Sequence, residues 1–180
     1  ADSSTNKVYV VLSYYNGAGW SEPKRVDGNA ILDDAPQLLS DSAGNLWMTY
    51  ASTTSAADAN SIASYATNQN IVVGSIDANA EFIELNRYTP SSDTYAHMQT
   101  LAIVNGAPTL FWVESVIKDD DDIFSSNTNT VKYAVYSGGT WGSAQTLTTI
   151  AHPIRQLTAG GNGVACNIDI DNDLNTTDDL

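Results

Sequence analysis

The stretch Tyr15-Asn-Gly-Ala-Gly-Trp20 returns twice in altered form, as Asp77-Ala-Asn-Ala-Glu-Phe82 and as Tyr136-Ser-Gly-Gly-Thr-Trp141. In each copy a tight turn rich in glycine or asparagine leads into an aromatic residue, and these aromatics recur roughly every 60 residues. A second motif recurs in phase with the first. Pro36 and Pro153 each lie eight residues before a Gly-Asn pair. A fixed period of this length indicates a repeat architecture.

Strand signals dominate the chain between these turns. No window shows the apolar stripe and caps of a convincing helix, and only residues 52–68 leave room for a helical turn or two. Short strands at close spacing are typical of a sandwich, a barrel or a propeller. The clearest runs of β-branched and aromatic residues, each bounded by turn residues, are 8–15, 45–51, 100–104, 109–114 and 131–136.

The repeat period favours the propeller, since one four-stranded blade with a loop insertion fills that length. We therefore expect an all-β chain of four-stranded antiparallel blades, with strands A to D counted from the centre outward. Residues 1–180 are expected to form one propeller-like unit. Its whole blades are predicted at 36–88 and 95–147, strands C and D of a partial blade within 7–35, and strands A and B of another within 153–180.

A half, two whole blades and a half make about three blade-equivalents, which do not close into a ring, because propellers start at about four blades. The ring is therefore expected to be incomplete in one chain. One interpretation is that further blades belong to a longer protein. The other is that a second copy completes the ring, each chain lending a half-blade to its partner.

The charge balance restricts the partners. The chain has 7 basic and 21 acidic residues and a net charge of −14, which argues against nucleic acid and anionic membranes. No apolar run reaches the length of a membrane span. The acidic surface is compatible with divalent cations, neutral glycans or basic proteins. The small, polar, lysine-poor composition favours an exported bacterial protein, extracellular or at the cell surface.

One phrase of the chain resembles the blade repeat of bacterial sialidase-like and lectin-like propellers. It runs through Tyr15-Asn-Gly-Ala-Gly-Trp20-Ser-Glu-Pro23, Asp34-Ala-Pro36-Gln-Leu38 and Asp41-Ser-Ala-Gly44-Asn-Leu-Trp47. In such repeats a Gly-Trp-Ser-x-Pro step on the outer strand leads into a Pro-x-Leu inner strand and then Asp-x-x-Gly-Asn. The resemblance implies the propeller fold, with glycan binding or a sialidase-like hydrolase activity.

The catalytic motifs of sialidases are not matched. The sialidase Asp-box has the form Ser-x-Asp-x-Gly-x-Thr-Trp. The stretch 41–47 has one residue too many between its aspartate and its glycine, and the stretch 137–141 has no aspartate. Sialidases also clamp the substrate carboxylate with three arginines from inner strands. Here Arg25 and Arg87 fall on predicted outer strands and only Arg155 on an inner one, so a complete sialidase site is not expected.

The predicted loops place the acidic residues on one face. Within a blade the A–B and C–D turns are short, whereas the B–C and D–A loops, at the opposite face, are long and better suited to binding. His97 and His152 fall near the starts of inner strands, either lining a central channel or packing in the core. The expected ligand-binding residues on this face are Asp33, Asp34, Asp58, Asp93, His97, His152 and Arg155.

Two acidic segments are candidate Ca²⁺ sites, because Ca²⁺ takes hard oxygen ligands. The run Asp119, Asp120, Asp121 and Asp122 is either a cation loop or a solvated loop tip. The stretch 167–178 resembles a dockerin calcium loop, with ligands at Asn167, Asp169, Asp171, Asp173 and Asp178, but its alternation also fits a strand.

The sequence offers little for catalysis. Cys166 lies in a predicted strand and is expected to be a buried, inert thiol. The aromatic residues Tyr14, Tyr15, Tyr50 and Tyr88 are expected to pack between strands rather than stack on sugars. We therefore expect a non-catalytic binding or adhesion module for a glycan or protein ligand. A glycoside hydrolase with its catalytic groups elsewhere, or a structural spacer repeat, are the alternatives.

Overall fold

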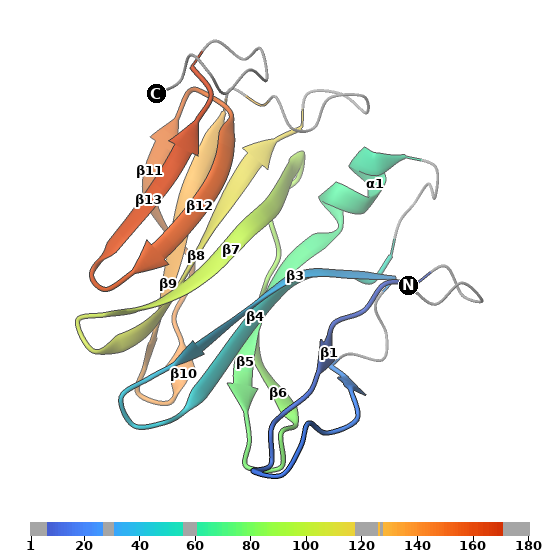
Figure 1. Ribbon diagram of the computed structural model, residues 1–180. Coiled ribbons are helices and arrows are strands. Elements are labelled where there is room, and N and C mark those ends of the chain that lie inside the picture. Colours follow the sequence, from blue (N-terminus) through green and yellow to red (C-terminus); the bar gives the residue numbers. More distant parts are fainter. Residues whose placement is uncertain (1–6, 27–30, 56–60, 118–125, 127, 171–180) are drawn as a thin grey trace.

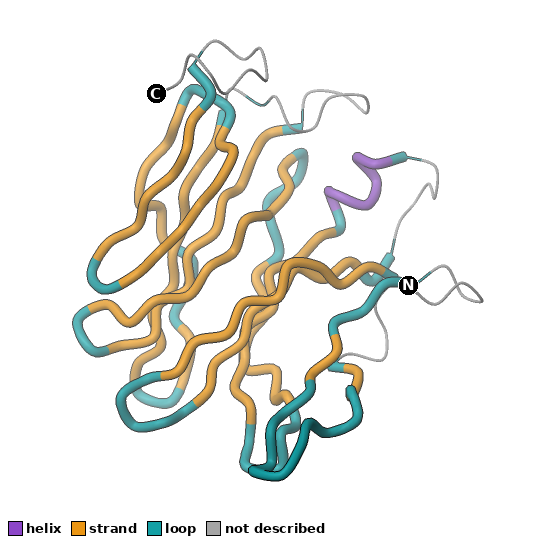
Figure 2. Tube along the Cα trace, in the orientation of Figure 1, coloured by secondary structure: helices purple, strands orange, loops and turns teal. Residues whose placement is uncertain are grey.

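The computed structural model describes residues 7–26, 31–55, 61–117, 126 and 128–170. Antiparallel sheets dominate this part of the chain, with one short helix, α1 (Ile62–Thr67), in the segment that left room for a helical turn (Figures 1 and 2). The expected all-β class is therefore confirmed. Among the described residues, no helix has the length and apolar character needed to cross a membrane.

Two antiparallel sheets have their strands in chain order. The first sheet contains β3 (Leu32–Ser40), β4 (Leu46–Thr53), β5 (Gln69–Ile76) and β6 (Phe82–Tyr88). The second sheet contains β7 (Thr94–Val104), β8 (Ala107–Val116) and β9 (Asn129–Ser137), with β10 (Thr140–Trp141) and β11 (Gln145–Ile150) both paired to β9. Strands are therefore present throughout the ranges 36–88 and 95–147, although β3 begins earlier, at Leu32, and β11 ends later, at Ile150.

Each end of the described chain is a two-stranded sheet. The N-terminal hairpin pairs β1 (Val11–Leu12) with β2 (Lys24–Arg25), and the C-terminal hairpin pairs β12 (Ile154–Gly160) with β13 (Gly163–Ile168). Each hairpin therefore contains half as many strands as the first sheet.

The four sheets pack face to face because successive side chains of a strand point to opposite faces, and both faces carry apolar residues. On β4, Met48 and Tyr50 pack with Val10 of the N-terminal hairpin, whereas Trp47 and Ala51 face the second sheet. The second sheet likewise packs its opposite face against the C-terminal hairpin. Every interface between neighbouring sheets therefore has its own apolar cluster.

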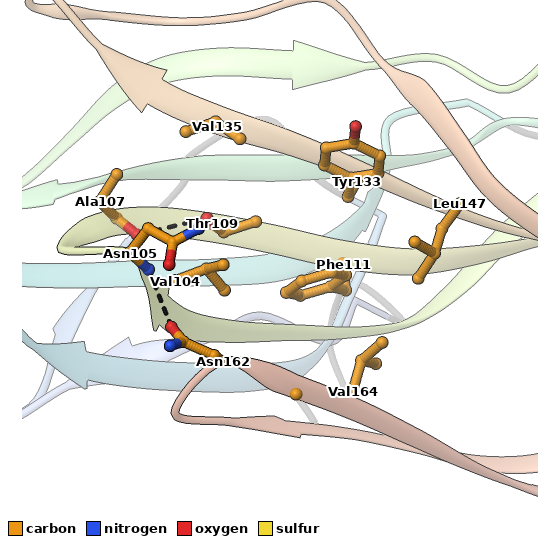
Figure 3. Close-up of a pocket in the computed structure, with 11 residues that line it drawn as sticks. Val104, Asn105, Ala107, Thr109, Phe111, Tyr133, Val135, Leu147, Asn162 and Val164 are labelled. Carbon is orange, nitrogen blue, oxygen red and sulfur yellow. Dashed lines mark hydrogen bonds between the residues drawn. The ribbon is translucent and has the colours of Figure 1, made fainter.

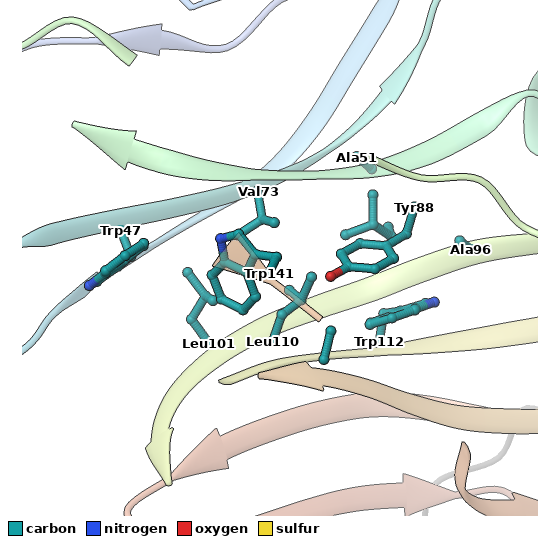
Figure 4. Close-up of a cluster of buried hydrophobic side chains, with 11 residues drawn as sticks. Trp47, Ala51, Val73, Tyr88, Ala96, Leu101, Leu110, Trp112 and Trp141 are labelled. Carbon is teal, nitrogen blue, oxygen red and sulfur yellow. The ribbon is translucent and has the colours of Figure 1, made fainter. Parts of the chain in front are cut away.

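The largest cluster lies between the first and second sheets. Trp112 on β8 is fully buried, and its ring centroid lies 4.8 Å from that of Tyr88 on β6 (Figure 4). Trp141 lies beside Val73 and 5.9 Å from the ring centroid of Trp47. Aromatic side chains bury large apolar areas, so these residues hold the two sheets together.

The two ends of the strands differ. The hairpin turns between β3 and β4, β5 and β6, β7 and β8, and β12 and β13 gather at one end, which we call the turn end (Figure 1). The strands β3, β7 and β12 begin at the opposite end, where α1 lies, which we call the loop end. The connections at the loop end are not all longer than these turns, because 89–93 joins β6 to β7 and 151–153 joins β11 to β12. The expected long connection is present between β4 and β5, at 54–68.

Two packing predictions need correction. Cys166 is exposed rather than buried, because it lies on β13, the edge strand of the C-terminal hairpin. Tyr50 and Tyr88 are buried between sheets as expected, but Tyr14 and Tyr15 are exposed, because no described sheet covers the outer face of the N-terminal hairpin.

Gly74 on β5 lies at a register shift in the pairing with β6, where the two strands approach closely. A Cβ added there would collide with the carbonyl oxygen of Ile83 and come within 2.7 Å of the Phe82 ring. We expect Gly74→Ala to lower the free energy of unfolding by about 1–3 kcal/mol through overpacking, measured by chemical denaturation. Gly160→Ala is the control, because its added Cβ meets open space; equal losses in both variants would contradict this account.

Candidate functional site

The strands β3, β7 and β12 share an irregularity near the loop end. Pairing with the next strand shifts register between Asp34 and Gln37, between His97 and Thr100, and between Ile154 and Gln156. Within the first two bulges, Ala35 (φ 50°) and Met98 (φ 55°) adopt the left-handed region although neither is glycine. Such strained bulges recur beside functional sites, where they re-aim side chains.

A side chain ties the first two bulges together. The Gln99 amide Nε2 donates to the carbonyl oxygen of Ala35 at 2.7 Å and lies 3.5 Å from that of Asp34. Gln99 Oε1 and Ser52 Oγ, both buried, have no hydrogen-bond partner among the described residues. Buried polar atoms are nearly always paired, so ordered water or a bound group is expected beside them.

A polar chain runs from His97 towards the start of β12. His97 Nε2 lies 2.8 Å from Ser115 Oγ, which donates to Asn129 Oδ1 at 2.5 Å. The Asn129 amide Nδ2 donates to the carbonyl oxygens of Ser126 and His152, both at 2.7 Å. Since the single Ser115 proton is committed to Asn129, His97 is the donor to Ser115, which fixes its tautomer with the proton on Nε2.

Burial lowers the pKa of His97 to about 3, because the ring, stacked on Tyr95 at 4.4 Å between centroids, loses solvation for its charged form. His97 is therefore neutral at physiological pH. Its side chain orients the strands at the loop end, and a neutral, hydrogen-bonded ring with so low a pKa is a poor general base.

Arg155 on β12 forms an ion pair with Asp169. Arg155 Nε donates to Asp169 Oδ2 at 2.9 Å, and Asp169 is almost fully buried. The Asp169 amide also donates to the carbonyl oxygen of Pro153 at 2.9 Å. The planar guanidinium suits this contact, which fastens the segment after β13 to the start of β12.

The remaining predicted residues divide between buried, exposed and undescribed positions. Asp33 is buried at the start of β3, whereas Asp34 and Asp93 are exposed at the loop end, and Asn167 is exposed on β13. Within the described residues, no three acidic, histidine or cysteine side chains gather as a metal site requires. Asp58, Asp119, Asp120, Asp121, Asp122, Asp171, Asp173 and Asp178 lie outside the described residues.

The stretch 41–47 that was compared with an Asp-box has a structural role at the turn end. Asp41 Oδ1 accepts from the backbone amides of Ala43 and Asn45 at 2.9 Å, and Oδ2 accepts from Trp47 Nε1 at 3.1 Å. Together with the Asn45 side chain, these donors hold the pKa of Asp41 below its ordinary value. Asp41 therefore stabilises the turn between β3 and β4.

An apolar pocket at the turn end was not foreseen from the sequence. It has a volume of about 410 Å³ and opens between the outer face of the second sheet and the C-terminal hairpin (Figure 3). The Asn105 amide donates to Asn162 Oδ1 at 2.9 Å and so joins the two adjoining turns. Alternating apolar residues on β8 and β9 were its sequence signal. Its lining on the second sheet includes Val104, Thr109, Phe111, Tyr133, Val135 and Leu147.

No protein-family model matches this chain, and no curated protein matches it either. The function is therefore inferred from the geometry of the loop end and of the pocket.

Proposed function

We propose that this chain is a non-catalytic binding module built from β-propeller blades, exported to a bacterial surface, whose ligand docks at the loop end. A glycan is the first ligand class and a protein surface the second. The first and second sheets are the whole blades, and the two hairpins are half-blades.

Three features support the propeller arrangement. Each of the two larger sheets is an antiparallel meander, successive sheets pack face to face, and their short turns gather at one end. The contact of Gln99 with Ala35 places β7 beside β3, as expected of neighbouring innermost strands. Propeller ligands meet a surface formed by loops from several blades.

The observation that carries the binding proposal is the repeated strained bulge. A left-handed backbone at a non-glycine residue costs about 1–3 kcal/mol, yet Ala35 and Met98 both adopt it at corresponding places in β3 and β7. Asp93, just before β7, has φ 62° as well. Ala80 and Asn105 adopt this backbone as well, but in the hairpin turns of the turn end. Ala35 and Met98 adopt it inside strands, and this favours a loop-end surface whose shape is held for recognition.

Binding rather than catalysis is favoured because the groups best suited to chemistry have structural partners. His97 is hydrogen-bonded to Ser115 and neutral, and Arg155 is paired with Asp169. The exposed carboxylate of Asp34 accepts from the Ala35 amide through Oδ1 at 2.6 Å, which leaves Oδ2 as an acceptor for sugar hydroxyls. Asp93 is exposed as well. Ca²⁺, recruited by the acidic loops, is proposed to order this surface.

The test is binding to an array of defined glycans, with Ca²⁺ and then with chelator. We expect Asp34→Asn to weaken binding by at least about tenfold, because a hydrogen bond to a charged group contributes about 1.5–3 kcal/mol. Glu22→Gln removes the same charge near the turn end and is the matched control. Undiminished binding by Asp34→Asn together with Asp93→Asn would contradict a loop-end site, and no glycan or protein binding would favour a spacer.

A further inference from the structure

We propose that two copies of this chain join end to end, with Trp20 of each copy packing into the apolar pocket at the turn end of the other. In this arrangement β1 of one copy extends the C-terminal hairpin of its partner along the edge of β13. The proposal concerns the two open ends of the stack of sheets, and it does not depend on a ligand at the loop end.

Trp20 is the exposed member of a repeated packing position. Phe82 and Trp141, which follow the corresponding turns, pack towards the sheet that precedes their own: Phe82 joins the cluster with the N-terminal hairpin, and Trp141 lies against Trp47 of the first sheet. Trp20 is 73% exposed, and its ring contacts Tyr15 in its own hairpin at 5.7 Å between centroids. The sheet that would cover Trp20 is not among the described ones.

The pocket lies where such a tryptophan is expected. Trp47 of the first sheet corresponds to Thr109 of the second, because they pair with Leu39 and Ala102, which lie equally far beyond the bulges of β3 and β7. On the next strand Trp47 pairs with Ser75 and Thr109 with Val135. Trp141 packs at Trp47, and the pocket is lined by Thr109 and Val135. The pocket is therefore the position on the second sheet that Trp141 occupies on the first.

The opposite face of the stack shows the matching exposure. By the same register Leu38 on β3 corresponds to Leu101 on β7. Leu101 is 7% exposed because the first sheet covers it, whereas Leu38 is 61% exposed. A copy that brings its C-terminal hairpin onto β3 would bury Leu38 as Leu101 is buried.

The two hairpins complement each other as sheet edges. In the full sheets the order is that of the chain, so the C-terminal hairpin supplies the first two strands and the N-terminal hairpin the last two. Two-stranded sheets are marginally stable and their edges favour further pairing. Joining β13 to β1 of a second copy gives an antiparallel sheet of four strands, the number in the first sheet.

A second copy is the occupant because the chain contains both halves of the contact. Trp20 and the pocket each have an apolar surface without cover, both lie at the turn end, and a twofold axis would satisfy both pairs at once. The interface is then the same packing that already joins the first and second sheets within one chain.

The experiment measures mass and tryptophan accessibility of the full chain over a range of concentrations. Light scattering is expected to give twice the 19.2 kDa chain mass. The chain has four tryptophans, and Trp47, Trp112 and Trp141 are buried. Acrylamide quenching should therefore find one accessible tryptophan in dilute monomer and none in the dimer.

Substitutions of Trp20 and of the pocket residue Leu147 test whether these two sites form the dimer contact. Trp20→Ala removes the aromatic anchor and is expected to raise the dimer dissociation constant about 30-fold for each of the two packing sites. Leu147→Lys places a charge in the pocket and should have a similar effect, and both should leave monomer melting unchanged because both residues are exposed. Ile62→Ala, equally exposed but at the loop end, is the control and should dimerise normally.

A chain that stays monomeric at all concentrations, with Trp20 always accessible, would overturn the proposal and indicate that further sheets of a longer protein cover the pocket. A dimer that neither Trp20→Ala nor Leu147→Lys weakens would overturn it as well, because the contact would then lie elsewhere.

Discussion

Replacing Trp112 by alanine is expected to lower the free energy of unfolding by about 3–5 kcal/mol. Trp112 is fully buried between the first and second sheets, with its ring 4.8 Å from that of Tyr88. Its indole Nε1 also donates to Glu114 Oε1 at 3.2 Å. The substitution removes the apolar contact, leaves a cavity between two rigid sheets, and takes a donor from a buried carboxylate.

The measurement is chemical denaturation followed by circular dichroism. Leu85→Ala, on the same stack but at an exposed position of β6, is the control and should change stability by less than about 0.5 kcal/mol. A loss below about 1 kcal/mol for Trp112→Ala would contradict the face-to-face packing of the two sheets, because a tryptophan at a loose interface relaxes at little cost.

Acidification from pH 6.5 towards pH 3 is expected to destabilise the protein through His97. The pKa of His97 is lowered to about 3 in the folded protein, whereas an unfolded histidine has a pKa of about 6.5. Between these values the unfolded chain binds one more proton, so stability rises with pH. The contribution is fully present above pH 6.5 and is lost as pH falls, with a limiting slope of about 1.4 kcal/mol per pH unit.

His97→Gln isolates this effect, because glutamine stays neutral and can still donate to Ser115. We expect the variant to lack the histidine contribution, so the stability difference between the two proteins should change by a few kcal/mol between pH 7 and pH 4. The carboxylates titrate in both proteins and cancel in that difference. Parallel pH curves would contradict the lowered pKa of His97, because they would show that the ring can be charged in the folded state.

The sequence predicted the strands well because their signals are local. The apolar runs of β4 and β8, which follow the turns Gly44-Asn45 and Asn105-Gly106, indicate strands without any information from distant residues. Cys166 was placed correctly on a strand but wrongly in the core. Burial depends on which sheet covers a face, and the pattern of one strand does not contain that information.

The loop-end site was predictable only in part. The predicted strand positions placed Asp34, His97 and Arg155 near the starts of strands, and in the structure they lie in the first halves of β3, β7 and β12. The pairing of Arg155 with Asp169 and the chain from His97 through Ser115 to Asn129 could not be read from the sequence, because each joins residues more than ten positions apart. The left-handed backbone of Ala35 and Met98 has no sequence signal, since neither residue favours that region.

Hydrogen exchange of backbone amides, with and without the glycan that binds best on the array, tests most directly that ligands dock at the loop end. We predict slower exchange on binding at residues 31–36 and 91–99, around the bulges of β3 and β7. The turns at 41–45, 105–106 and 161–162 should exchange unchanged. Protection confined to those turns would contradict the account, because the ligand would then bind at the turn end.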